Sequence, residues 1–148
     1  MIEVTQTITA HDPAAGQFGD CFRACIASIL ELPIEDVPHT MAYEEHLVED
    51  PGQWYPQLNE WLRPRGLAFL CLDTEVAAPA DWFRAIEPAF TSYHVLSGLG
   101  PRGHNHSVVA CNGRLAWDPH PSRAGLVGPM SHNGKWEIGL IVKGGTLA

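Results

Sequence analysis

The chain has 148 residues, of which 45% are hydrophobic and 18% are charged, as in one globular domain that buries a core without disulfides or metals. Its formal net charge of −8 argues against a general nucleic-acid-binding protein, because such proteins neutralise phosphates with basic patches. The sequence has no apolar run of about 18 residues and no basic start followed by an apolar segment. We therefore expect no membrane span, no signal peptide and a cytoplasmic location.

The four cysteines stand at positions 21, 25, 71 and 111. They form neither a CxxC pair, as in zinc sites, nor a small secreted disulfide framework, so we expect free thiols. The chain also shows no internal repeat, no low-complexity tract and no linker. A single domain over residues 1–148 is predicted.

The first predicted elements are a weak edge strand over residues 2–9 and a turn-rich loop over 11–19. A helix follows over 21–30, with Asp20 as its N-cap residue. Its core-facing stripe consists of Phe22, Cys25, Ile26, Ile29 and Leu30. The opposite face carries the small residues Ala24, Ala27 and Ser28, so we expect the helix to be covered on two sides.

Cys21 falls at the first helical position of this segment. Free N–H groups of the first turn and the positive end of the helix dipole favour the thiolate there, and the thiolate is the nucleophilic form. Cys21 is therefore the candidate nucleophile. Cys25, one turn deeper within the apolar stripe, is predicted to be an ordinary buried cysteine.

The loop before this helix carries Gln17. A side-chain amide just upstream of a nucleophile can donate a hydrogen bond to a developing oxyanion, beside the nucleophile's own backbone N–H. Gln17 is therefore a candidate oxyanion residue, and a solvated loop glutamine is the alternative.

The middle of the chain predicts structural elements rather than a site. Pro33 marks a break or the start of a short second helix, and residues 40–49 are weakly amphipathic. An amphipathic helix begins near Trp54 and ends near Pro64, followed by a buried strand over 67–73. A short helix over 80–88 has Asp81 as a plausible cap.

From residue 91 onward the pattern is one of strands. They are predicted over 92–98, 106–111, 114–119 and 136–143. Helices come early and strands late, which indicates an α+β fold rather than an alternating α/β fold.

His106 begins the second of these strands, and Asp118 ends the next one. A hairpin of this length can place an imidazole beside a carboxylate. The histidine would take the thiol proton of Cys21 and later protonate the leaving group, and the aspartate would fix its tautomer and stabilise the imidazolium.

The register of the hairpin decides whether His106 and Asp118 share a face. A regular two-residue turn at Asn112 and Gly113 places them on opposite faces. We therefore predict either a three-residue loop with Gly113 in a G1 bulge, or a bulge nearer Asp118.

The segment DCFRACIASIL at 20–30, followed by HSVVACNGRLAWDP at 106–119, resembles the C39-type branch of the papain-like cysteine peptidases. That family has a cysteine in a DC-x-x-A helix and an H-x-VV strand leading to a DP pair. The chain is also similar to small uncharacterised bacterial and phage proteins that share the patterns FGDCFRACIASIL and DPHPS.

This resemblance implies a papain-like fold with Cys21 as nucleophile, His106 as base and Asp118 as orienting acid. The family pattern places the oxyanion glutamine where this chain has Ala15, and Gln17 lies closer to the cysteine.

A zinc site is the alternative use of the same side chains. Imidazole and carboxylate are good zinc ligands, and the candidates are His94, His104, His106, His120 and Asp118. No pair has the helical HxxxH spacing, so we expect neither a metal nor another cofactor.

We therefore expect an α+β domain that hydrolyses a peptide or other amide bond in a peptide or protein substrate, without nucleic acid or a membrane as partner. Arg102, in a glycine-rich loop, and His120 are expected to line the substrate cleft, with plain loop roles as the alternative. Two other functions remain open: an acyltransferase or transglutaminase-like enzyme with the same triad, and a non-catalytic papain-like binding module. The oligomeric state is also left open.

Overall fold

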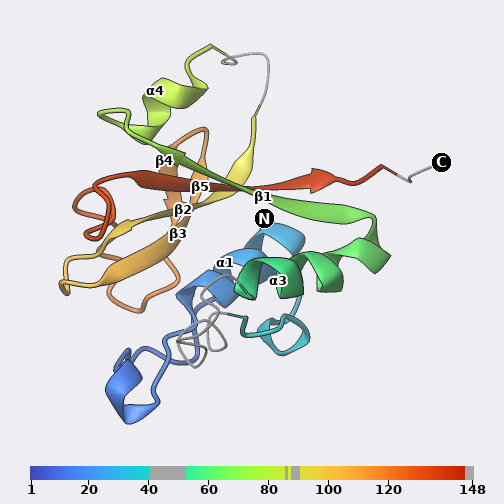
Figure 1. The fold of residues 1–148 in the computed structure, drawn as a ribbon, viewed down its shortest axis with the longest axis horizontal. Helices are drawn as coiled ribbons and strands as arrows, with labels where there is room; N and C mark the ends of the chain where they lie inside the picture. The colour runs from blue at the N-terminus through green and yellow to red at the C-terminus, as the bar shows by residue number, and fades with distance from the viewer. Residues whose placement is uncertain (41–52, 86, 88–90, 146–148) are drawn as a thin grey trace.

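The computed structural model describes residues 1–40, 53–85, 87 and 91–145 (Figure 1). Its helices and 3-10 turns are η1 (Pro13–Ala15), α1 (Cys21–Leu30), η2 (Ile34–Asp36), α3 (Trp54–Leu62), η3 (Arg63–Arg65) and α4 (Pro79–Phe83). Its strands are β1 (Leu67–Thr74), β2 (Tyr93–Leu99), β3 (Asn105–Cys111), β4 (Arg114–Trp117) and β5 (Trp136–Lys143). The predicted α+β class is confirmed, and β5 has the predicted bounds.

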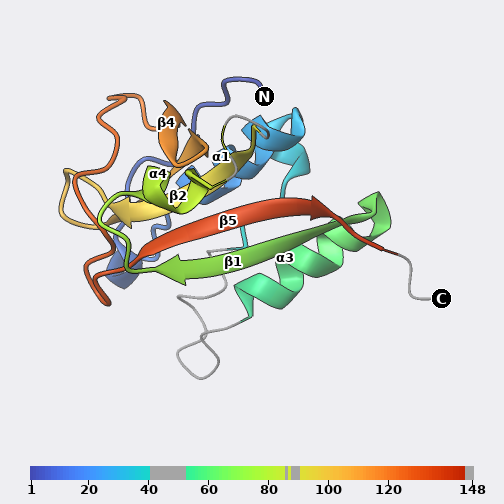
Figure 2. The same ribbon diagram turned by 90° about the horizontal axis from the view of Figure 1, so that it is seen from above.

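The five strands form one antiparallel sheet in the order β1-β5-β2-β3-β4. β5, the last strand of the chain, therefore lies between β1 and β2 (Figure 2). The strand predicted over 67–73 is confirmed as β1, but the prediction that it is buried was wrong, because β1 is an edge strand. Phe69 is buried, whereas Leu70 and Leu72 are exposed on the other face of β1.

Two apolar clusters cover the two faces of the sheet. α1 packs against β2 and β3, and α3 packs against β1, all on one face, whereas α4 lies on the other (Figures 1 and 2). Phe22 and Ile26 of α1 and Leu58 of α3 belong to the first cluster. Phe83 of α4 contributes to the second. The apolar stripe of α1 thus faces the sheet, as predicted.

The N-terminal segment is not the predicted strand. Residues 2–9 contain no strand and instead cross the small-residue face of α1, where the backbone N–H of Ile2 donates to the Ser28 carbonyl at 3.0 Å. The N–H of Val4 donates to Ser28 Oγ at 3.1 Å. Ala24 and Ala27 are fully buried beside them. α1 is therefore covered on two sides. The side chain and the carbonyl of Ser28 accept backbone N–H groups that a strand would have bonded to a neighbouring strand.

The break or short helix predicted at Pro33 is the 3-10 turn η2, which begins directly after Pro33. The helix predicted over 80–88 begins at Pro79, so Asp81 lies inside α4 and is not its cap. Residues 41–49 of the weakly amphipathic stretch lie outside the described residues.

Candidate active site

Cys21 is the first residue of α1, and its partly exposed side chain lines a cleft. Asp20 occupies the N-cap position, but its carboxylate does not cap the helix as predicted. It is buried and accepts hydrogen bonds from the backbone N–H groups of Thr7 and Ile8, at 2.9 and 2.8 Å. Asp20 therefore holds the N-terminal segment, and the first-turn N–H groups of α1 remain without a side-chain cap.

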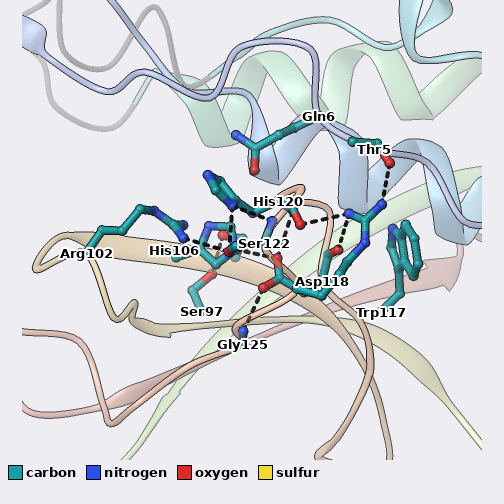
Figure 3. A network of polar contacts seen from close by, with 12 residues as sticks. Thr5, Gln6, Ser97, Arg102, His106, Trp117, Asp118, His120, Ser122 and Gly125 are labelled. Atoms are coloured by element: carbon teal, nitrogen blue, oxygen red, sulfur yellow. Dashed lines mark hydrogen bonds and ion pairs between the residues drawn. The ribbon is translucent and has the colours of Figure 1, made fainter.

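His106 and Asp118 meet as the sequence predicts. His106 Nε2 lies 2.7 Å from Asp118 Oδ1, and both residues are buried (Figure 3). The His106 side chain is also hydrogen-bonded to Cys21. Because Nε2 is used by Asp118, Nδ1 is the ring nitrogen left for the thiol. The structure thus brings the three predicted residues into one contiguous arrangement.

Asp118 is held in one orientation by backbone donors. Its Oδ1 also accepts the N–H of His120 at 2.8 Å, and its Oδ2 accepts the N–H of Gly125 at 2.7 Å (Figure 3). Burial would raise the pKa of this carboxyl, but the hydrogen bonds from His106 and the two N–H groups lower it to about 2. Asp118 is therefore a fixed carboxylate at neutral pH.

The charge of His106 follows from its two partners. Burial disfavours the imidazolium and would lower its pKa, but the hydrogen bonds to Asp118 and Cys21 outweigh burial and raise the pKa to about 9. His106 is therefore protonated at neutral pH. A buried cation beside a thiol and a carboxylate is the arrangement that stabilises a thiolate.

The hairpin between these residues shows how they come to share a face. Asn112 and Gly113 form a two-residue turn with φ of 47° and 78°, and Cys111 pairs with Arg114. The predicted three-residue loop was therefore wrong. The register then shifts between Val109 and Ala110, so that β4 carries a bulge. The alternative prediction, a bulge nearer Asp118, is confirmed, and the bulge restores the shared face.

Cys25 is fully buried one turn deeper in α1, as predicted. Burial raises the pKa of its thiol well above the usual value, and nearby Cys21 and Asp118 raise it further. Cys25 therefore has the environment of an inert core thiol. All four cysteines of the chain are free.

Gln17 does not reach this site. Its side chain is exposed, its backbone forms an isolated bridge with Asp12, and it is not among the cleft-lining residues. Gln6 lines the cleft instead and is 6% exposed. Gln6 Nε2 donates to the Ile8 carbonyl at 2.7 Å, and within the described part of the chain Gln6 Oε1 is buried without a partner. No motif spacing pointed to Gln6, because its position depends on the N-terminal segment crossing α1.

The cleft has a volume of about 480 Å³ and contains the Cys21–His106 contact. Arg102 and His120, the two predicted substrate-binding residues, both line it. They come from the β2–β3 turn and from the loop after β4. The cleft is therefore formed by α1, by the N-terminal segment and by loops from one end of the sheet.

Of the zinc candidates, His104, His106 and His120 line the cleft, but within the described residues no three of the candidates bring ligand atoms close enough together to share a metal ion. His94 is completely buried, accepts the Gly113 N–H at Nε2 and contacts the Val95 carbonyl through Nδ1. Its ring stacks on Phe83 at 4.5 Å, and burial lowers its pKa. Within the described residues, the group of three side chains close enough to share a metal ion is Cys71, Asp73 and Glu137, which were not candidates.

Among the described residues, no helix is long and apolar enough to cross a membrane. Comparisons with family models, curated proteins and solved structures found no match to this chain. The evidence for function is therefore the arrangement of the residues themselves.

Proposed function

We propose that this protein is a cysteine-dependent hydrolase of papain-like architecture that cleaves a peptide or other amide bond. The observation that carries the proposal is the buried His106–Asp118 pair at 2.7 Å, hydrogen-bonded to a cysteine that opens α1. Further support comes from the contrast with Cys25, a buried thiol whose raised pKa suits a core role.

In the first step, the Cys21 thiolate attacks the carbonyl carbon of the substrate and forms a C–S bond. The carbonyl electrons move to oxygen, giving a tetrahedral oxyanion. When the oxyanion collapses, the C–N bond breaks, and the His106 imidazolium donates its Nδ1 proton to the departing amine. Asp118 keeps the ring oriented throughout, because two backbone N–H groups fix its own carboxylate.

In the second step, neutral His106 accepts a proton from water as that water attacks the thioester carbonyl. The C–S bond breaks, the acid product leaves, and the thiolate–imidazolium pair is restored. Atoms and charge balance over the cycle, with one water consumed for each amide bond cleaved.

The oxyanion needs hydrogen-bond donors near Cys21. The backbone N–H of Cys21 lies in the uncapped first turn of α1, where no carbonyl of the same helix can accept it. Gln6 Nε2 uses one N–H for Ile8 and keeps a second. These two groups are the donors we assign to the oxyanion, with Gln6 taking the role that the sequence pattern gave to Gln17.

The test combines a panel of fluorogenic peptide and amide substrates with intact-protein mass spectrometry of the acyl-enzyme. We expect turnover by the native chain and none by Cys21→Ala. Gln6→Ala should lower kcat by roughly 10²-fold, whereas the matched variant Gln17→Ala should not change it. Iodoacetamide should label Cys21 and leave Cys25 unlabelled until the protein unfolds.

Two outcomes would replace the proposal. Acyl-enzyme that is released by an added amine but not by water would indicate an acyltransferase. Labelling of Cys21 without turnover of any substrate would favour a binding module.

A further inference from the structure

Arg102 lies at the tip of the turn that joins β2 to β3, shortly before His106. The turn is closed by backbone hydrogen bonds from Gly100 to the His104 carbonyl at 2.9 Å and from Gly103 to the Gly100 carbonyl at 3.1 Å. Gly103 has φ of 88°, a conformation that other residues rarely adopt. The turn therefore has a defined shape and presents Arg102 at the rim of the cleft.

Arg102 differs from the other arginines in its partners. Its Nη1 donates to Ser122 Oγ at 3.3 Å, and within the described residues it forms no ion pair (Figure 3). The other arginines each pair with a carboxylate or stack on an indole ring. They are Arg23, Arg63, Arg84 and Arg114 in ion pairs, and Arg65 and Arg123 on tryptophans. The chain has 17 acidic and 9 basic residues, so acidic partners are abundant. Among the described arginines, Arg102 is nevertheless the one that has neither a carboxylate nor an indole ring as its partner.

Ser122 links Arg102 to His120. The Ser122 backbone N–H donates to His120 Nδ1 at 3.1 Å, so Nδ1 is an acceptor and the ring proton of neutral His120 is on Nε2. Ser122 Oγ lies 2.8 Å from the same Nδ1 and accepts a hydrogen bond from Arg102. This chain of contacts holds the guanidinium in place and uses one of its five N–H groups.

The charges around the cleft favour an anion, because Arg102 and the protonated His106 both line it. Four further histidines line it, namely His11, His104, His120 and His132, and burial lowers the pKa values of His104 and His120, so these two rings are neutral hydrogen-bonding groups. Among the described residues, Glu137 on β5 is the one acidic residue that lines the cleft, and burial raises its pKa. The whole chain has a formal net charge of −8, so the sign of the charge at the cleft is opposite to that of the molecule as a whole.

We propose that Arg102 binds a carboxylate of the substrate, so that the cleft selects acidic peptides. This inference rests on the proposed function, because it assumes that the substrate's reacting carbonyl lies at Cys21. The carboxylate comes either from an Asp or Glu side chain or from a free α-carboxylate. The guanidinium offers both of them the same paired N–H donors.

Three iodoacetyl probes test the proposal without a known substrate. They are iodoacetyl-glutamate α-amide, iodoacetyl-glutamine α-amide and iodoacetyl-glutamine with a free α-carboxylate. Each alkylates Cys21, because the thiolate displaces iodide from the CH₂ carbon of the iodoacetyl group and a thioether C–S bond forms. The readout is the labelling rate of each acidic probe divided by that of the neutral probe. Comparing the two acidic probes distinguishes recognition of a side-chain carboxylate from recognition of a terminal α-carboxylate.

We expect Arg102→Gln to lower at least one of these ratios by about two- to fivefold, the range for a single solvent-exposed ion pair. The decrease should shrink as salt is added, because salt screens exposed charges. Arg63→Gln removes the same charge from η3, outside the cleft, and should leave both ratios unchanged.

Equal ratios in the native chain and in Arg102→Gln would overturn the carboxylate assignment while Cys21 still reacts. Failure of the proposed function gives a different result, in which Cys21 reacts with the neutral probe no faster than it does in His106→Ala.

Discussion

Two buried histidines on neighbouring strands have opposite electrostatic environments. His94 on β2 is surrounded by backbone groups and the Phe83 ring, and burial lowers its pKa. His106 on β3 meets Asp118 and Cys21, which raise its pKa to about 9 despite burial. The depth of burial is similar, so the charged partners make the difference.

The comparison teaches that burial alone does not indicate which histidine is reactive. A neutral imidazole that donates to a carbonyl and accepts from an N–H fits a core without any charge. A histidine with an aspartate and a thiol as its two partners is held in the charged form instead. The following predictions test that difference, from the largest expected effect to the smallest.

His106→Ala should lower kcat by roughly 10³- to 10⁴-fold, because it removes the group that transfers the proton and stabilises the thiolate. The measurement is steady-state hydrolysis together with the iodoacetamide labelling rate of Cys21. If His94→Ala, corrected for its folded fraction, caused an equal loss, the two histidines would not have separate roles.

Asp118→Asn should lower kcat by roughly 10²- to 10⁴-fold, because an amide can present the wrong group to His106. The pKa of His106 should also fall from about 9, since it loses the carboxylate that raises it. NMR titration of the His106 ring protons measures this directly. An unchanged pKa in the folded variant would contradict the account given for the charge of His106.

His94→Ala should lower the free energy of unfolding by about 2–4 kcal/mol, because it leaves a cavity beside Phe83 and an unpaired Gly113 N–H. Urea denaturation followed by circular dichroism gives the change. Ser92→Ala, just before β2 at a residue whose backbone groups bond to Asn112, is a control for general effects. A loss of stability below 1 kcal/mol would remove the structural role of His94.

The two histidines should also limit stability at opposite ends of the pH range. The folded pKa of His94 is lowered, so the unfolded chain binds the proton more readily, and stability is lost as pH falls below 6.5. The folded pKa of His106 is raised, so its contribution is complete below 6.5 and is lost as pH rises toward about 9. Asp118, lowered to about 2, adds to the acid loss below 3.8.

The loss in free energy of unfolding at each end of the pH range, the acid limb and the alkaline limb, should be a few kcal/mol at most. Unfolding measured from pH 4 to 10 should show a flatter acid limb in His94→Ala and a flatter alkaline limb in His106→Ala. The reverse assignment of the two limbs would contradict the comparison.

The strongest sequence predictions came from local patterns. The bounds of α1 follow from an apolar stripe with 3.6-residue periodicity, and β5 is a run of apolar residues after a turn. The hairpin spacing allowed His106 to meet Asp118, and strand alternation then required a bulge for both side chains to share a face. These arguments need only neighbouring residues.

The errors came from contacts between distant parts of the chain. Asp20 is a good N-cap by type, but Thr7 and Ile8 bind its carboxylate. Gln6 reaches the cleft because the N-terminal segment crosses α1, and its sequence alternation gave no sign of this. Gln17 had the better spacing but lies on an exposed turn. Spacing describes local geometry and does not contain such long-range docking.

The docking of the N-terminal segment has a kinetic consequence. The Gln6 N–H donates to the Pro119 carbonyl at 3.0 Å, and Trp117 Nε1 donates to the Val4 carbonyl at 2.9 Å. These bonds join segments that are more than a hundred residues apart, and contacts of such high order form late and slowly during folding. A chain emerging from the ribosome therefore presents Cys21 long before Asp118 can reach it. The thiol would therefore lack its histidine and aspartate partners until the C-terminal strands have folded.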